Sequence, residues 1–220
     1  MRRTRFPWLA LALLAACTKT TESTSRARPD LGELLPRIHS AALVSIEVTE
    51  YEVAVGGVPQ LKEDWSAGAR QAIADALATE LRSRQIELRV VDRDPAMQEE
   101  INDLRALSEA INASLAFPSG SFDYSLGPVR GLVDRYRVDA LVFVWGRARL
   151  PTGGQRLLAA LHGKGGEDVG QLAMTIVDSS GDVVWFNHRA LVGSNADLRQ
   201  PDNAAELVHA IVSDLPAAHP

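Results

Sequence analysis

The sequence predicts an α/β (α+β) fold with a single mixed β-sheet of about five strands and helices on its faces. Short runs of β-branched and apolar residues alternate with longer segments of helical periodicity. Two runs near the C-terminal end are joined by only a short polar turn. Strands separated by helices pair in parallel, whereas a hairpin pairs antiparallel. The expected order of elements is therefore β-α-β-α-α-β-(α)-β-β-α.

The first half of the domain contributes two strands and two helices. In the strands, apolar and polar residues alternate and β-branched residues are frequent. In the first helix, apolar residues recur every four positions, and Asp64 or Ser66 can cap its start. The second helix starts at Asp94-Pro95, a capping side chain followed by proline. These patterns place the elements at 41–55, 66–84, 86–92 and 94–115.

The second half is built around an apolar run at 140–145 (ALVFVW), which predicts a strand buried on both faces. Before it, the Pro, Gly and Ser content of 117–127 (FPSGSFDYSLG) predicts a loop. Residues 155–162 are ambiguous, and their pattern leans towards a helix. Asp202 or Asn203 can cap the last helix. The remaining elements are a helix at 128–136, strands at 172–176 and 183–192 joined by a turn at 178–182, and a helix at 202–215.

The N-terminal segment has the pattern of an export signal. Three arginines in the first five residues precede an apolar run that ends at Leu14-Ala15-Ala16-Cys17. The run has about twelve residues, whereas a membrane-spanning helix needs about 20. The motif resembles the signal and lipobox of bacterial lipoproteins. This resemblance implies a Cys17 that carries diacylglyceryl and a further acyl chain such as palmitate. The alternative is a secretory signal of a soluble protein with an incidental thiol.

The chain is expected to have three parts. Residues 1–16 form the signal peptide, which is removed. Residues 17–29 form the lipidated cysteine and a flexible tether, because 18–29 (TKTTESTSRARP) is polar, rich in Ser and Thr and free of aromatics. Residues 30–220 form a single globular periplasmic domain, which its core must hold together since no second cysteine is present. Thr18 and Lys19 follow the cysteine, and in lipoproteins this implies the periplasmic face of the outer membrane.

Composition and motifs exclude several classes of function. The net charge of −5 argues against a nucleic-acid partner, which requires a basic surface. The five histidines follow no metal-binding spacing, and the sequence contains neither GxSxG nor SxxK. The segment 163–166 (GKGG) lacks the residues of a phosphate-binding loop. We therefore expect no metal, no cofactor and no enzymatic activity.

Two groups of residues are candidate contacts. Phe117, Phe122 and Tyr124 lie among small polar residues of the 117–127 loop. Such aromatics either pack back onto the domain or anchor a partner. Arg147 and Arg149 alternate just beyond the apolar run, where the strand is expected to emerge. They can contact an anionic group, a glycan or a lipid headgroup, and the alternative is simple solvation of a strand end.

The lipobox, the β-α-β start, the VDALVFVWG strand at 138–146 and the IVDSSGDVVW hairpin at 176–185 together resemble a group of envelope lipoproteins. This group includes the curli-secretion lipoprotein and the penicillin-binding-protein activator lipoproteins. The resemblance implies a non-enzymatic assembly, adaptor or regulatory factor that docks on another envelope protein. The alternative is a membrane-tethered module that binds a small molecule or lipid, which would require a deep apolar pocket.

Overall fold

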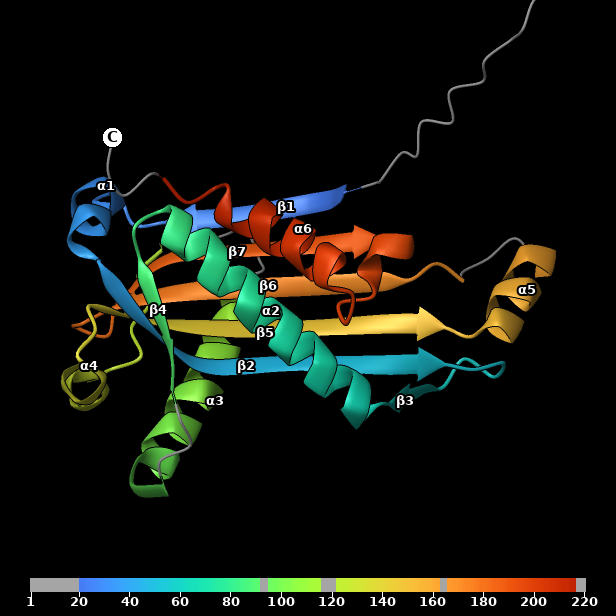
Figure 1. The fold of residues 1–220 in the computed structure, drawn as a ribbon, viewed down its shortest axis with the longest axis horizontal. Coiled ribbons are helices and arrows are strands. Elements are labelled where there is room, and N and C mark those ends of the chain that lie inside the picture. Colours follow the sequence, from blue (N-terminus) through green and yellow to red (C-terminus); the bar gives the residue numbers. More distant parts are fainter. Residues whose placement is uncertain (1–19, 92–94, 116–121, 163–165, 217–220) are drawn as a thin grey trace, which may run out of the picture.

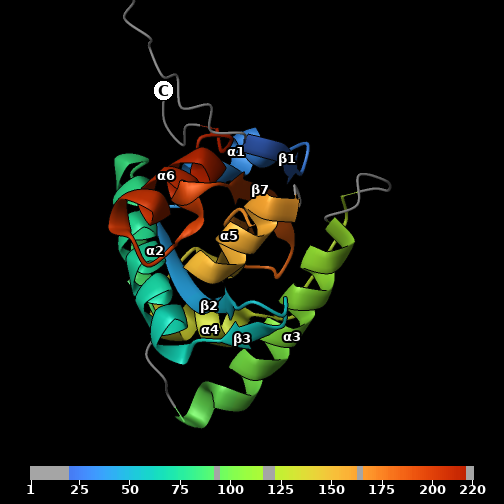
Figure 2. The same ribbon diagram turned by 90° about the vertical axis from the view of Figure 1, so that its right-hand side faces the viewer.

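The computed structural model describes residues 20–91, 95–115, 122–162 and 166–216. They form one mixed β-sheet with helices on both faces, which confirms the predicted fold class. Helices α2 (Glu63–Ser83) and α6 (Pro201–Val212) lie in front of the sheet in Figure 1, and α3 (Gln98–Leu115) lies behind it. Figure 2 shows the same layers from the end of the strands.

The sheet has seven strands rather than about five, in the order β1-β7-β6-β5-β2-β3, with β4 also paired to β2. As predicted, the early pairs β2–β4 and β2–β5 are parallel, and the hairpin pair β6–β7 is antiparallel. The pair β5–β6 is also antiparallel, although a helix separates these two strands in the sequence. The two additional strands, β1 and β3, lie at opposite edges. The strands are β1 (Thr20–Ala27), β2 (Ser40–Val53), β3 (Pro59–Leu61), β4 (Glu87–Val90), β5 (Ala140–Pro151), β6 (Val169–Asp178) and β7 (Val183–Val192).

The expected caps of two helices are not confirmed. Helix α2 begins at Glu63, so Ser66 lies inside it, where the Ser66 hydroxyl donates to the Lys62 carbonyl and accepts from the Glu50 N–H. Helix α6 begins after Gln200, and no side chain caps it. The helical reading of 155–162 is confirmed by α5. The remaining helices are α1 (Leu31–Leu34), α4 (Arg130–Tyr136), α5 (Gly153–His162) and the 3-10 turns η1 (Leu35–Arg37), η2 (Pro95–Met97) and η3 (Ser194–Ala196).

The core has two layers, one on each face of the sheet. The front layer packs the sheet against α2 and α6, and its largest buried side chain is Trp185. The back layer packs the sheet against α3 and α4 around Phe143 and Phe186. Strand β5 belongs to both layers, because Val142 and Val144 point to the front whereas Phe143 points to the back. The continuous apolar run is therefore buried on both faces, as its pattern predicts.

The expected flexible tether at 17–29 is wrong for most of its length. Residues Thr20–Ala27 form β1, which pairs antiparallel with β7 at the edge of the sheet, and Cys17 lies outside the described residues. An edge strand needs only backbone hydrogen bonds on one side, so a polar Ser/Thr-rich segment can supply it. Its composition therefore resembles that of a disordered tether, although its partner strand lies far along the chain.

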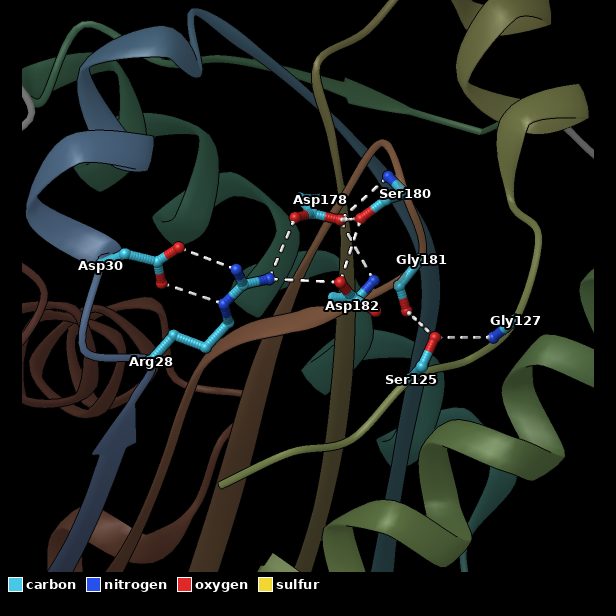
Figure 3. A network of polar contacts seen from close by, with 8 residues as sticks. All are labelled: Arg28, Asp30, Ser125, Gly127, Asp178, Ser180, Gly181 and Asp182. Carbon is cyan, nitrogen blue, oxygen red and sulfur yellow. Dashed lines mark hydrogen bonds and ion pairs between the residues drawn. The ribbon is translucent and has the colours of Figure 1, made fainter. Parts of the chain in front are cut away.

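An ion-pair network fastens the end of β1 (Figure 3). The Arg28 guanidinium donates to both carboxylate oxygens of Asp30, at 3.0 and 2.8 Å. Its Nη1 lies 3.3 Å from Asp182 and 3.5 Å from Asp178, on the turn between β6 and β7. Because one guanidinium contacts all three carboxylates, the chain leaves β1 in a fixed direction beside this turn.

Glycine is required at the same turn. Gly181 has a φ of +96°, and a Cβ there would fall on the carbonyl oxygen of Gly127. The close approach lets the Ser125 hydroxyl donate to the Gly181 carbonyl while the Leu126 N–H donates to the same oxygen. The segment 125–127 is thus held against the β6–β7 turn (Figure 3).

Removal of β1 is expected to destabilise the domain. A chain that begins at Asp30 loses the backbone pairing to β7 and the Arg28 network, so its free energy of unfolding should fall by several kcal/mol relative to a chain from Thr18. Arg28→Ala, which keeps β1 and loses only part-exposed ion pairs, should cost about 1 kcal/mol or less. Chemical denaturation of the three proteins measures both effects, and equal midpoints for the Thr18 and Asp30 chains would exclude a structural role for β1.

Candidate functional site

One half of the back face of the sheet is not covered by any described helix. Helices α3 and α4 lie against the half where β5 begins, and the strands continue beyond them (Figure 1). Because side chains alternate between faces, the residues that follow Trp145 at every second position lie on this uncovered half. We call it the open face; it comprises Thr49, Tyr51, Arg147, Arg149, Val169, Gln171 and Ala190.

An arginine between two aromatic rings forms the centre of the open face. The Arg147 guanidinium carbon lies 5.5 Å from the centroid of the Tyr51 ring and 5.8 Å from that of Trp145. These are cation–π distances, and both contacts favour this position of the guanidinium group. Arg147 Nε is buried without a hydrogen-bond partner in the described part of the chain. Arg147 as a residue is part-exposed, and an accessible guanidinium group beside aromatic rings is suited to a carboxylate or phosphate.

The two arginines singled out from the sequence lie on the same face. Arg149 follows Arg147 on β5, is exposed, and pairs with Val169 of β6 and Tyr51 of β2 in the register of the sheet. An anion contact by either residue stays a prediction. The role of Tyr51 was missed, because only the parallel pairing of β2 with β5 places it beside these arginines.

A cavity of about 300 Å³ adjoins the open face where α3 crosses the sheet. Trp145, Ala173 and Phe186 provide apolar walls, and Glu109, Asn112, Gln171 and His188 provide polar groups. Burial lowers the pKa of His188, which favours the neutral imidazole. A cavity of this size is at the lower end of the range for ligand sites.

The loop aromatics lie beside β1 and are partly buried. The Phe122 and Tyr124 rings meet edge to face at 6.3 Å, and both pack against the back layer of the core. The Tyr124 hydroxyl is 2.9 Å from that of Ser114 on α3, and the Arg26 guanidinium lies 5.5 Å from the Phe122 centroid. Phe117 lies outside the described residues. Both described rings thus have partners within the domain, and a contact role for this loop stays a prediction.

The described residues contain neither a cluster of metal-binding side chains nor a membrane-spanning helix. No group of three or more His, Cys, Asp or Glu side chains in this part of the chain is close enough to hold a metal ion. No helix in the same residues combines the length and apolar character needed to cross a bilayer.

Comparison with known proteins gives limited similarity. No protein-family model matches the chain, and no curated protein matches it. Among solved structures, a PelC dodecamer variant from Paraburkholderia phytofirmans is 16% identical with a TM-score of 0.46, and covers 90% of this chain and 100% of its own. A second PelC dodecamer from this organism is 15% identical with a TM-score of 0.44, at the same coverage. Similarity at this level assigns no function to the chain.

A buried carboxyl group lies on the opposite face of β2. Glu50 is 0% exposed; its Oε1 accepts from the Leu198 N–H at 3.0 Å, and its Oε2 lies 3.4 Å from Arg199 Nε. Arg199 also stacks on Trp65 at 3.9 Å and pairs with Asp197 at 2.7 Å. Burial, assisted by the Asp197 charge, raises the pKa of Glu50 from its ordinary value of 4.5 to about 7.

This raised pKa predicts a loss of stability with rising pH. The native state holds the Glu50 proton more tightly than the unfolded chain, so the free energy of unfolding should fall between about pH 4.5 and 7, by up to about 3 kcal/mol. Glu50→Gln keeps an acceptor for Leu198 and should remove most of this fall. Glu52→Gln, which alters a part-exposed pair with Lys62, should leave it in place. Denaturation at several pH values provides the measurement; parallel curves for wild type and Glu50→Gln would disprove the role of Glu50.

Proposed function

We propose that this protein is a lipid-anchored lipoprotein of the outer membrane, on its periplasmic face, which docks another envelope component through the open face and performs no catalysis itself. The observation that carries the proposal is Arg147, which is part-exposed and lies within cation–π distance of Tyr51 and Trp145 on an uncovered sheet face. Arginine and aromatic residues are the side chains that most often dominate the energy of protein interfaces.

The shape of the site supports a macromolecular partner. The arginines lie on a broad sheet surface outside the cavity beside α3, so a ligand confined to that cavity would not reach Arg149. A surface segment of another protein can span both, and its carboxylates would pair with the guanidinium groups. The partner chemistry that fits best is therefore an acidic protein surface.

A second candidate is a small amphiphilic ligand in the cavity itself. The Trp145 and Phe186 side chains offer an apolar wall, and the polar groups of Asn112 and His188 converge on the same space. This arrangement resembles that of small-molecule sites. Binding there would be lost in Ala173→Phe, which fills the cavity, whereas docking through Arg147 would depend less on that position.

Membrane attachment is tested at Cys17. Cys17→Ser should abolish acylation and leave an unprocessed precursor, because the alkylated thiol is what lipoprotein signal cleavage requires. Metabolic labelling with a fatty acid, followed by mass measurement of the mature chain, reports both steps. Continued labelling of Cys17→Ser would show that the anchor is not at this residue.

Docking is tested at Arg147. Arg147→Gln should reduce the recovery of the partner cross-linked to the protein in native membranes by about tenfold or more, since central arginines of interfaces contribute several kcal/mol. Arg130→Gln makes the same change on α4, away from the open face, and should leave recovery unchanged. The melting temperatures of both variants serve as the check on folding. Equal recovery from Arg147→Gln and wild type would refute docking through this face.

A further inference from the structure

One end of the sheet brings together the start of β1 and the ends of several other strands. In the strand register Thr20 pairs with Leu191, Val169 with both Val192 and Arg149, and Val53 with Pro151. We call this end, from Thr20 across to the β2–β3 turn and α5, the anchor end. It is on the right in Figure 1 and faces the viewer in Figure 2. Cys17 precedes Thr20 by three residues in the sequence.

The exposed large apolar side chains concentrate at the anchor end. Among the described residues, nine such side chains are exposed, and seven of them belong to α5, the β2–β3 hairpin or the first residue of β6. Single exposed apolar residues are normal, but a contiguous group marks an interaction surface. The seven are Val55, Val58, Leu61, Leu157, Leu158, Leu161 and Val169.

Helix α5 is oriented opposite to an ordinary surface helix. A helix of a soluble domain buries its leucines, yet here Leu157 is 65% and Leu161 75% exposed, and Ala159 is the residue that faces the domain. Leu157 and Leu161 are four residues apart and form one outward stripe with Leu158.

Contacts on the inner side fix this orientation. The Arg156 guanidinium pairs with the nearly buried Asp168 at 2.6 Å, which ties α5 to the segment before β6. Gly166 approaches Ala159 so closely that a Cβ would collide with it. On the other side, Val55 of the β2–β3 turn lies against Gly154, so the turn and the helix form one surface. The leucines are therefore presented outward by a packed helix.

We propose that the anchor end inserts into the membrane leaflet, with the α5 leucines and the valines of the β2–β3 turn at the boundary between headgroups and acyl chains. This inference rests on the proposed function in one respect, the acylation of Cys17. Three extended residues span only about 10 Å, so an acylated Cys17 would hold this end against the leaflet. Amphipathic helices at such interfaces bury their apolar face by about 5–10 Å.

The experiment places a fluorescent label on α5. The sequence has a single cysteine, so in the acylated protein Leu161→Cys provides the only free thiol for an environment-sensitive nitrobenzoxadiazole label. The protein is reconstituted in phosphatidylethanolamine–phosphatidylglycerol vesicles with plain or brominated acyl chains. We expect a blue-shifted emission and a loss of fluorescence in the brominated vesicles.

Val90→Cys is the matched control. Val90 is also an exposed apolar residue, at 63%, but it pairs with Leu43 near the start of β2. This position is about 33 Å along the strand from Val53 at ~3.3 Å per residue. Its label should show neither the shift nor the loss of fluorescence.

A second arm of the experiment distinguishes the membrane contact of α5 from the effect of acylation at Cys17. The mass of the purified protein reports acylation directly, and a chain from Thr18, which contains every described residue, carries the same labels without a lipid. In this arm we expect the same ranking of the two positions with a smaller loss. Equal signals at 161 and 90 in both arms would overturn the leaflet contact. So would a blue shift at 161 that grows with protein concentration in the absence of vesicles, since a second copy would then cover α5.

Discussion

Strand β5 must be covered on both faces, and the rest of the structure follows from this requirement. Its front face is covered by α2 and α6, and its back face by α3 and α4. Gly146 allows this packing at the centre, because a Cβ there would collide with Leu172 and crowd Val48. Beyond Trp145 the back face changes from apolar to arginine, and there the described helices no longer cover it. The open face thus begins where the need for burial ends.

The strands with a local signal were predicted correctly from the sequence. β2, β4, β5, β6 and β7 each carry alternation or a continuous apolar run, and these patterns follow from burial. β3 has only three residues and starts at Pro59, and β1 is polar, so neither segment has a strand pattern of its own. β3 forms because it pairs with the adjacent β2, and β1 forms because it pairs with the distant β7. Ser66 does not cap α2, because it lies inside the helix and its hydroxyl bonds to the Lys62 carbonyl and the Glu50 N–H.

The candidate site could be predicted only in part. Alternation along one strand identifies Arg147 and Arg149 as neighbours on one face. The stacking of Arg147 on Tyr51 requires the register between β2 and β5, which is a tertiary property. Likewise, the pattern of α5 shows that the helix has two different faces, but not that the leucine face points outward. The outward orientation comes from Gly166 and Asp168, which occupy the inner side.

The antiparallel pairing of β1 with β7 also determines how the protein would respond to mechanical load. The chain enters β1 at Thr20, at the anchor end, so a pull from the residues before it acts along the axis of the strand. The hydrogen bonds between antiparallel strands are perpendicular to that axis. Such a force shears all of them at once, whereas a sideways force would peel them one after another. When the domain is pulled away from its N-terminal segment, the hydrogen bonds of β1 therefore resist the force together. The Arg28 ion pairs at the far end of β1 add to this resistance.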